Sequence, residues 1–328
     1  MAHLLDIRDL SVTIPTDGGP ARILEDVALS LDRGGTLGLV GESGSGKSMT
    51  ALAIMGLLPR AAHATGAVRL DGDDMLGWDE DRLCDMRGAR IAMIFQEPMT
   101  ALNPVHTIGA QIAEGIRIHL GLGRGEAEDR ARRLLDRVGL PAPRFSPHAY
   151  PHQLSGGQRQ RVMIAIALAC EPDLLIADEP TTALDVTVQA QILALIAEIA
   201  DDTGMALMMI THDLGVVAET TDRVAVMYAG RIVEEGSTAA VFAAPRHPYT
   251  AGLFAASPHA LEVVAGKRTR LAAIDGQVPD PSEKPAGCAF APRCSRRSPQ
   301  CADRPVMDAF SPDQSTACFH PLGLGGVR

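Results

Sequence analysis

The chain opens with alternating apolar and polar residues, which is the pattern of a β-strand with one buried face. Residues 4–14 alternate in this way, and residues 23–31 repeat the pattern after a turn-forming Thr-Asp-Gly-Gly-Pro cluster at 16–20. A short apolar run at 36–40 predicts a buried strand, which leads through a glycine-rich loop into a helical stretch at 48–58. The first part of the sequence therefore predicts two strands that each have one buried and one exposed face, followed by one fully buried strand and a helix.

A helical segment interrupts this pattern. Residues from about 98 to 151 read mostly as helix, with the clearest periodicity at 108–120 and 126–138. Buried-strand patterns return at 174–177 and 205–210 on either side of a helical run at 188–199, which is the repetition expected of a parallel sheet. We expect an α/β fold with a helical insertion.

The composition changes near the carboxyl end, where proline, charge and cysteine become frequent and periodicity fades. At 328 residues the chain exceeds the usual size of a single core. We therefore expect one large domain over residues 1–255, with a helical subdomain at about 98–155, followed by a loop-rich extension over residues 256–328.

The charge of the chain limits its partners. The formal net charge is −10, whereas nucleic acids and anionic lipid surfaces require clustered positive charge, so we expect no nucleic-acid partner. Charged residues interrupt the first ten positions, and no window approaches the length of a membrane span. We expect a cytoplasmic protein that could serve a membrane process only by docking on other subunits.

A phosphate-binding motif follows the buried strand at 36–40. The sequence Gly41-Glu42-Ser43-Gly44-Ser45-Gly46-Lys47-Ser48 matches the pattern G-x-x-x-x-G-K-[ST] between a predicted strand and a predicted helix. Lys47 would reach the β- and γ-phosphates and Ser48 would bind Mg²⁺. The backbone that would cradle phosphate belongs to Gly41, Ser43, Gly44, Ser45 and Gly46. The alternative is a flexible turn before a helix.

Two further strands end in polar residues. The strand at 174–177 is followed by Asp178 and Glu179, which suit a Mg²⁺ ligand and a base that activates water for attack on the γ-phosphate. The strand at 205–210 leads to His212, a candidate sensor of the γ-phosphate. The alternatives are a solvated turn before Pro180 for the two acids and an ordinary loop position for His212.

A second glycine-rich helix start makes the pattern specific. Leu154-Ser155-Gly156-Gly157-Gln158 opens an apolar helical run at 161–170 and can bind phosphate through its amides. With this pentapeptide the chain resembles the ABC ATPases, whose signature motif it matches. The resemblance covers residues 4–255 and implies the P-loop NTPase fold of an ABC nucleotide-binding domain. It also implies head-to-tail dimers, in which Ser155, Gly156, Gly157 and Gln158 of one subunit close over ATP on the other.

The resemblance assigns several further roles. Gln96 corresponds to the family's glutamine-loop residue, which contacts Mg²⁺ and links the nucleotide to the membrane partner. Asp185 corresponds to the aspartate at the dimer interface, Glu179 to the catalytic base and His212 to the switch histidine. An aromatic residue usually stacks on adenine near the end of the first strand in this family. Here that position holds Ile14, which would supply only apolar contact.

Two segments narrow the resemblance to the ATPases of oligopeptide, dipeptide and nickel importers, namely residues 96–104 and 245–250. That resemblance implies ATP-driven import of peptides or related solutes on the cytoplasmic side of the membrane. The implied partners are two transmembrane permease subunits, an extracytoplasmic solute-binding protein and a second ATPase subunit, expected to be a different chain.

Four of the six cysteines are close together near the carboxyl end: Cys288, Cys294, Cys301 and Cys318. A cytosolic location disfavours disulfides, and a short segment without its own core suggests a bound metal. The spacing C-x₅-C-x₆-C-x₁₆-C lacks the C-x₂-C pairs typical of zinc sites. The resemblance to peptide-importer ATPases favours a [4Fe–4S] cluster. Zinc and four free thiols remain alternatives.

Two other functions are compatible with an ABC ATPase sequence. One is a soluble ATPase that acts in DNA repair or translation, against which the acidic charge and the lack of a basic arm both count. The other is a regulatory ATPase that uses the cysteine-bearing extension as a redox sensor.

Overall fold

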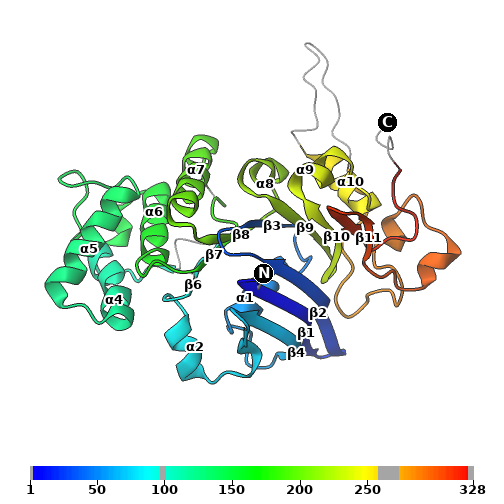
Figure 1. The fold of residues 1–328 in the computed structure, drawn as a ribbon, viewed down its shortest axis with the longest axis horizontal. Helices are drawn as coiled ribbons and strands as arrows, with labels where there is room; N and C mark the ends of the chain where they lie inside the picture. Colours follow the sequence, from blue (N-terminus) through cyan, green and yellow to red (C-terminus); the bar gives the residue numbers. More distant parts are fainter. Residues whose placement is uncertain (1–2, 97–100, 183, 258–272, 324–328) are drawn as a thin grey trace, which may run out of the picture. The chain divides into compact units, whose positions relative to one another are not determined.

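The structure is a computed structural model, and it describes residues 3–96, 101–182, 184–257 and 273–323. The chain forms two compact units (Figure 1). The first contains the described parts of Met1–Leu31, Thr36–Leu76 and Met209–Arg328, and the second contains those of Asp32–Gly35 and Gly77–Met208. The division at residue 255 that the sequence suggests stays a prediction.

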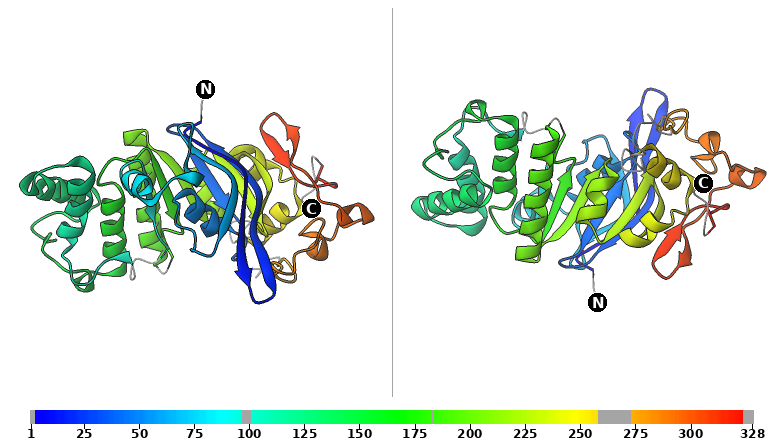
Figure 2. Two further views of the ribbon diagram at one scale, coloured as in Figure 1. Left: turned by 90° about the horizontal axis from the view of Figure 1, so that it is seen from below. Right: turned by 90° about the horizontal axis from the view of Figure 1, so that it is seen from above.

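An antiparallel sheet in the first unit contains the two strands predicted at the start of the chain. Its strand order is β2 (Gly19–Leu31), β1 (Leu5–Thr16), β4 (His63–Leu70) and β5 (Asp73–Asp74). The strands β1 and β2 form a long hairpin that closes at the pair Thr16 and Gly19 (Figure 2). The alternation places Val12 and Leu24 opposite each other in the core.

The first unit also contains β3 (Thr36–Val40), the predicted buried strand, which pairs in parallel with β9 (Arg223–Tyr228). Next to β9 lies antiparallel β10 (Arg231–Ser237). The helices of this unit are α1 (Lys47–Ile54), α8 (Leu214–Thr220), α9 (Thr238–Ala243) and α10 (Pro248–Ala256). The helix α1 is shorter than the predicted stretch at 48–58, because the chain leaves the helix after Met55 and turns at Gly56 with positive φ.

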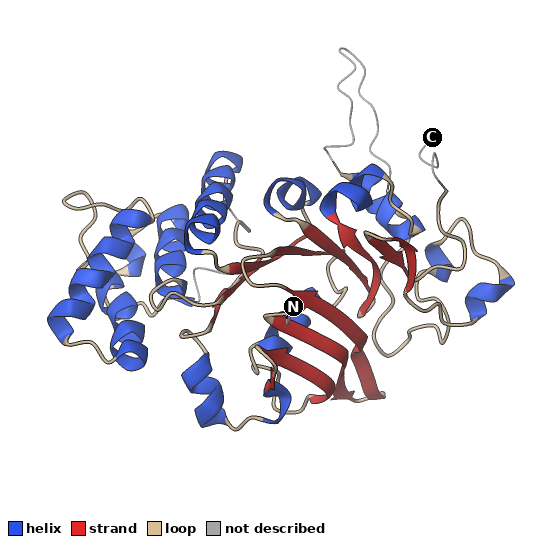
Figure 3. Ribbon diagram, in the orientation of Figure 1, coloured by secondary structure: helices blue, strands red, loops and turns tan. Residues whose placement is uncertain are grey.

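The carboxyl-terminal segment, residues 273–323, is mostly loop (Figure 3), but it adds regular structure to the first unit. Its strand β12 (Gln314–Thr316) pairs with β10, and β11 (Asp308–Ser311) pairs with β12. Two short 3₁₀ helices, η4 (Ala291–Arg293) and η5 (Pro299–Ala302), lie between these strands and residue 273. Ala289 and Phe290 are buried in a core cluster with Tyr228 and Tyr249, so the segment packs into the unit.

The second unit contains the helical insertion. The parallel strands β6 (Ile91–Ile94) and β7 (Leu174–Asp178) pair with Ile94 opposite Ala177. Its described helices are α2 (Glu80–Met86), α4 (Ile108–Leu120), α5 (Arg124–Arg137), α6 (Gly156–Ala167) and α7 (Val186–Thr203). The 3₁₀ turn η1 (Met75–Gly77) precedes α2, and η2 (Pro151–Gln153) precedes α6. The strand β8 (Ala206–Thr211) crosses the boundary between the units. The helices predicted at 108–120, 126–138 and 188–199 are confirmed, and none of the described helices is long and apolar enough to span a bilayer.

Candidate functional site

The glycine-rich loop connects β3 to α1, as its pattern requires. Gly41 directly follows the strand, and a Cβ atom there would lie 2.3 Å from the Met227 carbonyl oxygen. Gly46 caps α1 with φ of 111°, and a Cβ atom there would lie 2.8 Å from Leu24. Only glycine fits at both positions, because side chains would collide with β9 and β2. The loop backbone is therefore tightly curled before the start of a helix, the geometry that binds phosphate.

Lys47 folds back across this loop. Its side chain is almost fully buried, and its ammonium group donates hydrogen bonds to the carbonyls of Gly41 at 2.8 Å and Glu42 at 3.0 Å. Ser48 is exposed on the first turn of α1, so its hydroxyl is accessible to a metal ion. Both residues lie where the sequence predicts them, on the loop and the helix start.

The acidic end of β7 carries Asp178 and Glu179. Asp178 is buried as the last residue of the strand, and Glu179 follows with φ of 45°, a left-handed conformation that is unusual for a residue with a side chain. Gln96, just after β6, donates its amide hydrogen to Glu179 Oε2 at 3.0 Å. The hydroxyl of Thr182 donates to the same oxygen at 3.0 Å. The structure therefore brings together Gln96 and Glu179, which are 83 residues apart in the sequence.

The second glycine-rich motif forms the start of α6. Ser155 is the N-cap, where its hydroxyl accepts a hydrogen bond from the Gln158 amide at 3.4 Å. In return the Gln158 side chain accepts one from the Ser155 amide at 2.9 Å, which completes a capping box. A Cβ atom at Gly157 would lie 2.7 Å from Val188 Cγ1, so glycine permits the close approach of α6 to α7. The helix begins five residues before the predicted run at 161–170, because Ser155 caps it.

An open cavity of about 360 Å³ lies over this helix start. Its lining includes Ser155, Gly156, Gly157 and Gln158 of the motif, together with Asp185. The Asp185 carboxylate also caps α7 by accepting a hydrogen bond from the Val188 amide at 3.0 Å. The second unit thus gathers Ser155, Gly156, Gly157, Gln158 and Asp185 around one hollow whose helix start can receive an anion.

The structure places two other predicted residues, His212 and Ile14, on or next to strands. His212 is exposed directly after β8, and the next residue, Asp213, caps α8. Ile14 is half-buried in β1 opposite Ala21. Their roles toward the γ-phosphate and adenine stay predictions.

Residues 245–250 form hydrogen bonds both to β10 and to the glycine-rich loop between β3 and α1. The backbone amides of Arg246 and His247 donate to the carboxylate of Glu234 at 2.7 and 2.9 Å. Burial lowers the pKa of His247 to about 3, so its ring is neutral, and its Nδ1 accepts a hydrogen bond from the Tyr249 amide. The Tyr249 hydroxyl accepts a hydrogen bond from the Glu42 amide at 2.9 Å. This segment therefore supports the loop structurally.

The four clustered cysteines line one small cavity. Backbone amides donate to two of the sulfurs, from Arg296 to Cys294 at 3.4 Å and from His320 to Cys318 at 3.3 Å. Burial raises the pKa of the Cys318 thiol to about 11. Within the described residues, however, no group of three or more His, Cys, Asp or Glu side chains is arranged to hold a metal ion.

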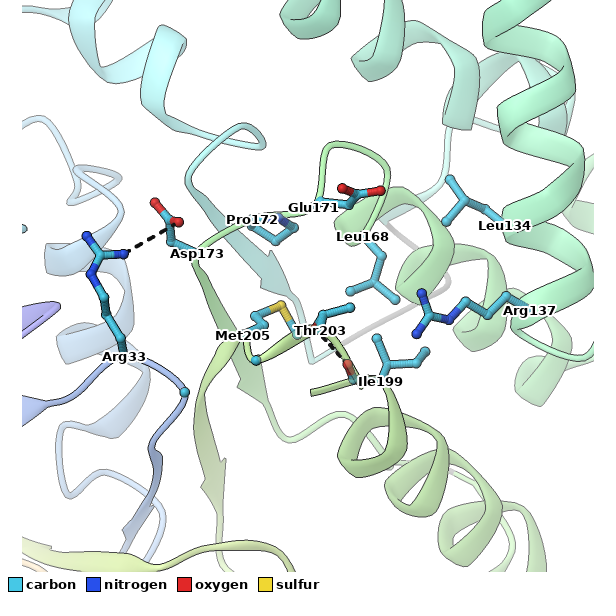
Figure 4. Close-up of a pocket in the computed structure, with 12 residues that line it drawn as sticks. Arg33, Leu134, Arg137, Leu168, Glu171, Pro172, Asp173, Ile199, Thr203 and Met205 are labelled. Carbon is cyan, nitrogen blue, oxygen red and sulfur yellow. Dashed lines mark hydrogen bonds and ion pairs between the residues drawn. The ribbon is translucent and has the colours of Figure 1, made fainter. Parts of the chain in front are cut away.

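Another cavity, of about 490 Å³, lies in the second unit at the opposite end of β7 from Asp178 (Figure 4). It lies beside the carboxyl ends of α6 and α7, and its charged lining includes Arg33 and Asp173, whose closest atoms are 3.8 Å apart. Because parallel α/β sheets bind ligands at the carboxyl ends of their strands, this cavity is separate from the nucleotide chemistry.

The structure also identifies contacts that no sequence motif indicates. Thr182 lies beside Glu179, and Arg293 of the carboxyl-terminal segment forms an ion pair with Glu42 of the glycine-rich loop. The position of Arg293, next to Cys294, carries no local signal for a contact 251 residues away.

Comparison with known proteins gives the family. A profile described as ABC transporter matches residues 24–182, and one described as the C-terminal region of oligopeptide/dipeptide transporters matches residues 233–301. A probable peptide ABC transporter ATP-binding protein of Sinorhizobium fredii is 50% identical over 96% of this chain and 94% of its own length. The dipeptide transport ATP-binding protein DppD of Escherichia coli is 45% identical over 98% of both chains.

Solved structures agree with these relatives. A dimeric ATP-binding cassette in a post-hydrolysis state, bound to ADP and phosphate, aligns with a TM-score of 0.65 at 29% identity. The alignment covers 71% of this chain and 98% of that one. These findings confirm the P-loop fold of an ABC ATPase, and they do not favour the non-transport alternatives. Because relatives at 45–50% identity match nearly its whole length, the chain belongs to the ABC transporter family, in the oligopeptide/dipeptide branch, as an ATP-hydrolysing subunit.

Proposed function

We propose that this chain hydrolyses ATP to drive the import of peptides through separate transmembrane subunits. The main support is the curled loop around Lys47. Relatives at 45–50% identity that are named as peptide transport ATP-binding proteins support the coupling to import. The match of residues 233–301 to the oligopeptide/dipeptide transporter region supports the substrate class.

In the proposed reaction the functional residues divide the binding of ATP and the activation of water among them. Lys47 would bind the β- and γ-phosphates, and Ser48, Asp178 and Gln96 are each proposed as contacts to Mg²⁺, which when bound would offset the charge of the phosphates. Glu179 accepts a proton from the attacking water, and its hydrogen bond from Gln96 orients the carboxylate. His212 senses the γ-phosphate.

The hollow over α6 suggests how two ATPase subunits cooperate. Its helix start and glycine amides suit a phosphate that the same chain does not supply, so Ser155 and Gly157 would close over ATP bound by a partner ATPase. Asp185 would contact that partner at the interface. We propose that the partner is a different ATPase chain.

The transporter would place this chain on the cytoplasmic face of the membrane. Two permease subunits and an extracytoplasmic solute-binding protein would complete it, as the family resemblance implies. ATP-driven closure of the two ATPase subunits would then be transmitted to the permease through the region around Gln96.

The four cysteines of the carboxyl-terminal segment are proposed to bind a [4Fe–4S] cluster, with zinc as the alternative. Their shared cavity and the amide hydrogen bonds to two sulfurs support a thiolate ligand set. Binding would require the thiols to lose protons and to converge.

Anaerobically purified protein should contain about four iron and four sulfide per chain. Cys294→Ser should lose this iron, and the isolated, exposed Cys84→Ser should keep it. Equal iron in both variants, or none in the unmodified chain, would contradict the assignment.

ATP turnover tests the assigned base directly. Glu179→Gln should keep ATP binding but lower steady-state hydrolysis by a factor of about 100 or more, because general base catalysis contributes that much. Glu198→Gln, which changes an exposed carboxylate on α7, is the matched control and should hydrolyse ATP at the original rate. Equal hydrolysis by the two variants would refute the role of Glu179.

A further inference from the structure

The side chain of Glu42 connects the phosphate-binding loop to the carboxyl-terminal segment. Its two carboxylate oxygens accept hydrogen bonds from the two terminal nitrogens of Arg293, at 2.7 and 3.0 Å. The Arg293 side chain is only 5% exposed and the Glu42 side chain is 29% exposed, so the guanidinium is largely shielded from solvent. Bidentate arginine–carboxylate pairs of this kind are both strong and directional.

The segment holds Arg293 rigidly. Its Nε donates to the carbonyl of Asp275 at 2.8 Å, and one terminal nitrogen donates to the carbonyl of Ile274 at 3.2 Å. The other terminal nitrogen lies 3.4 Å from the Tyr228 hydroxyl. A guanidinium fixed on several sides imposes its position on the carboxylate that it binds.

The backbone of Glu42 carries this constraint to the phosphate-binding lysine. The Glu42 carbonyl accepts hydrogen bonds from Lys47 Nζ at 3.0 Å and from the Ser45 amide at 3.2 Å. Its amide donates to the Tyr249 hydroxyl at 2.9 Å. Glu42 is thus held through its side chain by Arg293 and through its backbone by the loop and by Tyr249.

We propose that Arg293 is a positioning residue for the nucleotide: through its ion pair with Glu42, the carboxyl-terminal segment keeps the first turn of the phosphate-binding loop in its binding conformation. The inference rests on the proposed binding of ATP by this loop. Through the ion pair between Arg293 and Glu42, a segment outside the ATPase motifs becomes part of the ATP site.

Nucleotide affinity of the purified full-length chain tests the proposal, with MgATP as the ligand in titration calorimetry. Arg293→Ala and Glu42→Ala should each weaken binding about tenfold, which lies in the usual range of coupling between sites. The double variant should bind about as well as either single variant, because both changes break the same pair. In steady-state hydrolysis the loss should appear mainly in KM. Arg293→Lys should recover only part of it, since an ammonium group cannot bind the carboxylate bidentately.

Arg297→Ala is the matched control, because it removes an exposed arginine from the same segment and should bind MgATP normally. Thermal unfolding of every variant separates loss of folding from loss of affinity. Normal MgATP affinity in Arg293→Ala, or additive effects in the double variant, would overturn the proposal. A failure of the proposed function is distinguishable, because Lys47→Ala would then also bind MgATP normally.

Discussion

Glu179 adopts a left-handed backbone conformation, which costs a residue with a side chain roughly 1–2 kcal/mol. Two donors converge on one of its carboxylate oxygens, the Gln96 amide and the Thr182 hydroxyl, each at 3.0 Å. This arrangement fixes the direction of the proposed base. Local strain supported by side-chain hydrogen bonds is common where a catalytic group must be held in one orientation.

The hydroxyl of Thr182 should therefore contribute to turnover. Thr182→Val keeps the shape of the side chain but removes the donor, and we predict a fall in kcat of about tenfold, the effect of one hydrogen bond to a charged group. Thr182→Ser keeps the hydroxyl and should retain most of the activity. Steady-state ATP hydrolysis of the two variants measures this, and equal rates would show that the contact has no catalytic effect.

Glu25 forms a second buried ion pair, in the first unit. It is 8% exposed and contacts Arg231 and Lys284. Burial acts to raise its pKa, but the hydrogen bond and charge of Arg231, together with Lys284, outweigh burial, so the pKa is lowered. Its contribution to stability is therefore complete above the unfolded-state value of about 4.5 and is lost as the pH falls through the lower folded-state value.

Glu25→Gln should reduce the free energy of unfolding at pH 7 by about 3 kcal/mol, because it leaves two cations without their carboxylate. It should also make stability less sensitive to acid below about pH 4.5. Urea unfolding at pH 7 and at pH 4 measures both effects. Glu283→Gln, an exposed neighbour of Lys284, should change neither, and an identical loss in this control would contradict the account.

The placement of residues in contiguous motifs could be predicted from the sequence, because a strand, a loop and a helix start position them by local geometry. Lys47, Glu179 and Ser155 all lie on the elements that their motifs predict. Arg293 and Thr182 could not be identified in this way. Arg293 meets Glu42 across 251 residues, and only the folded chain defines that contact.

At the scale of elements, the contact between α6 and α7 depends on one glycine. A Cβ atom at Gly157 would lie 2.7 Å from Val188, whereas one at Gly156 would meet Leu184 only at 3.6 Å, an ordinary contact. We predict that Gly157→Ala lowers the free energy of unfolding by about 1–3 kcal/mol through overpacking. Gly156→Ala is the matched comparison.

The stability of Gly156→Ala should change little, because alanine also favours the helix. Thermal or urea unfolding of both variants distinguishes the two positions. Equal stability would show that α6 moves aside easily and that the close approach carries no constraint.

Most strands and helices could be predicted because their periodic patterns are long. The strands β1 and β2 and the helices α4, α5 and α7 follow such patterns. In contrast, β11 and β12 have four and three residues, too few for a recognisable period, so the carboxyl-terminal segment reads as loop. Its pairing with β10 depends on tertiary context.

At the scale of the whole molecule, the chain has two glycine-rich helix starts, at Lys47 and at Gly156. In the proposed function one nucleotide needs only one such loop of a given chain, and the second loop would serve ATP bound by a partner. The relatives named as peptide transport ATP-binding proteins suggest a function inside a membrane complex. The carboxyl-terminal segment contributes Ala289 and Phe290 to the core of the first unit, so it is part of that folded unit.

Peptide transport tests the central claim most directly. The complete transporter would be reconstituted in lipid vesicles, with this chain either unmodified or carrying Glu179→Gln, and labelled peptide uptake would be measured with and without MgATP on the side of the ATPase subunits. The account predicts ATP-dependent uptake by the unmodified complex and a loss of about 100-fold with Glu179→Gln. Equal uptake by the two complexes, or uptake that needs no ATP, would contradict it.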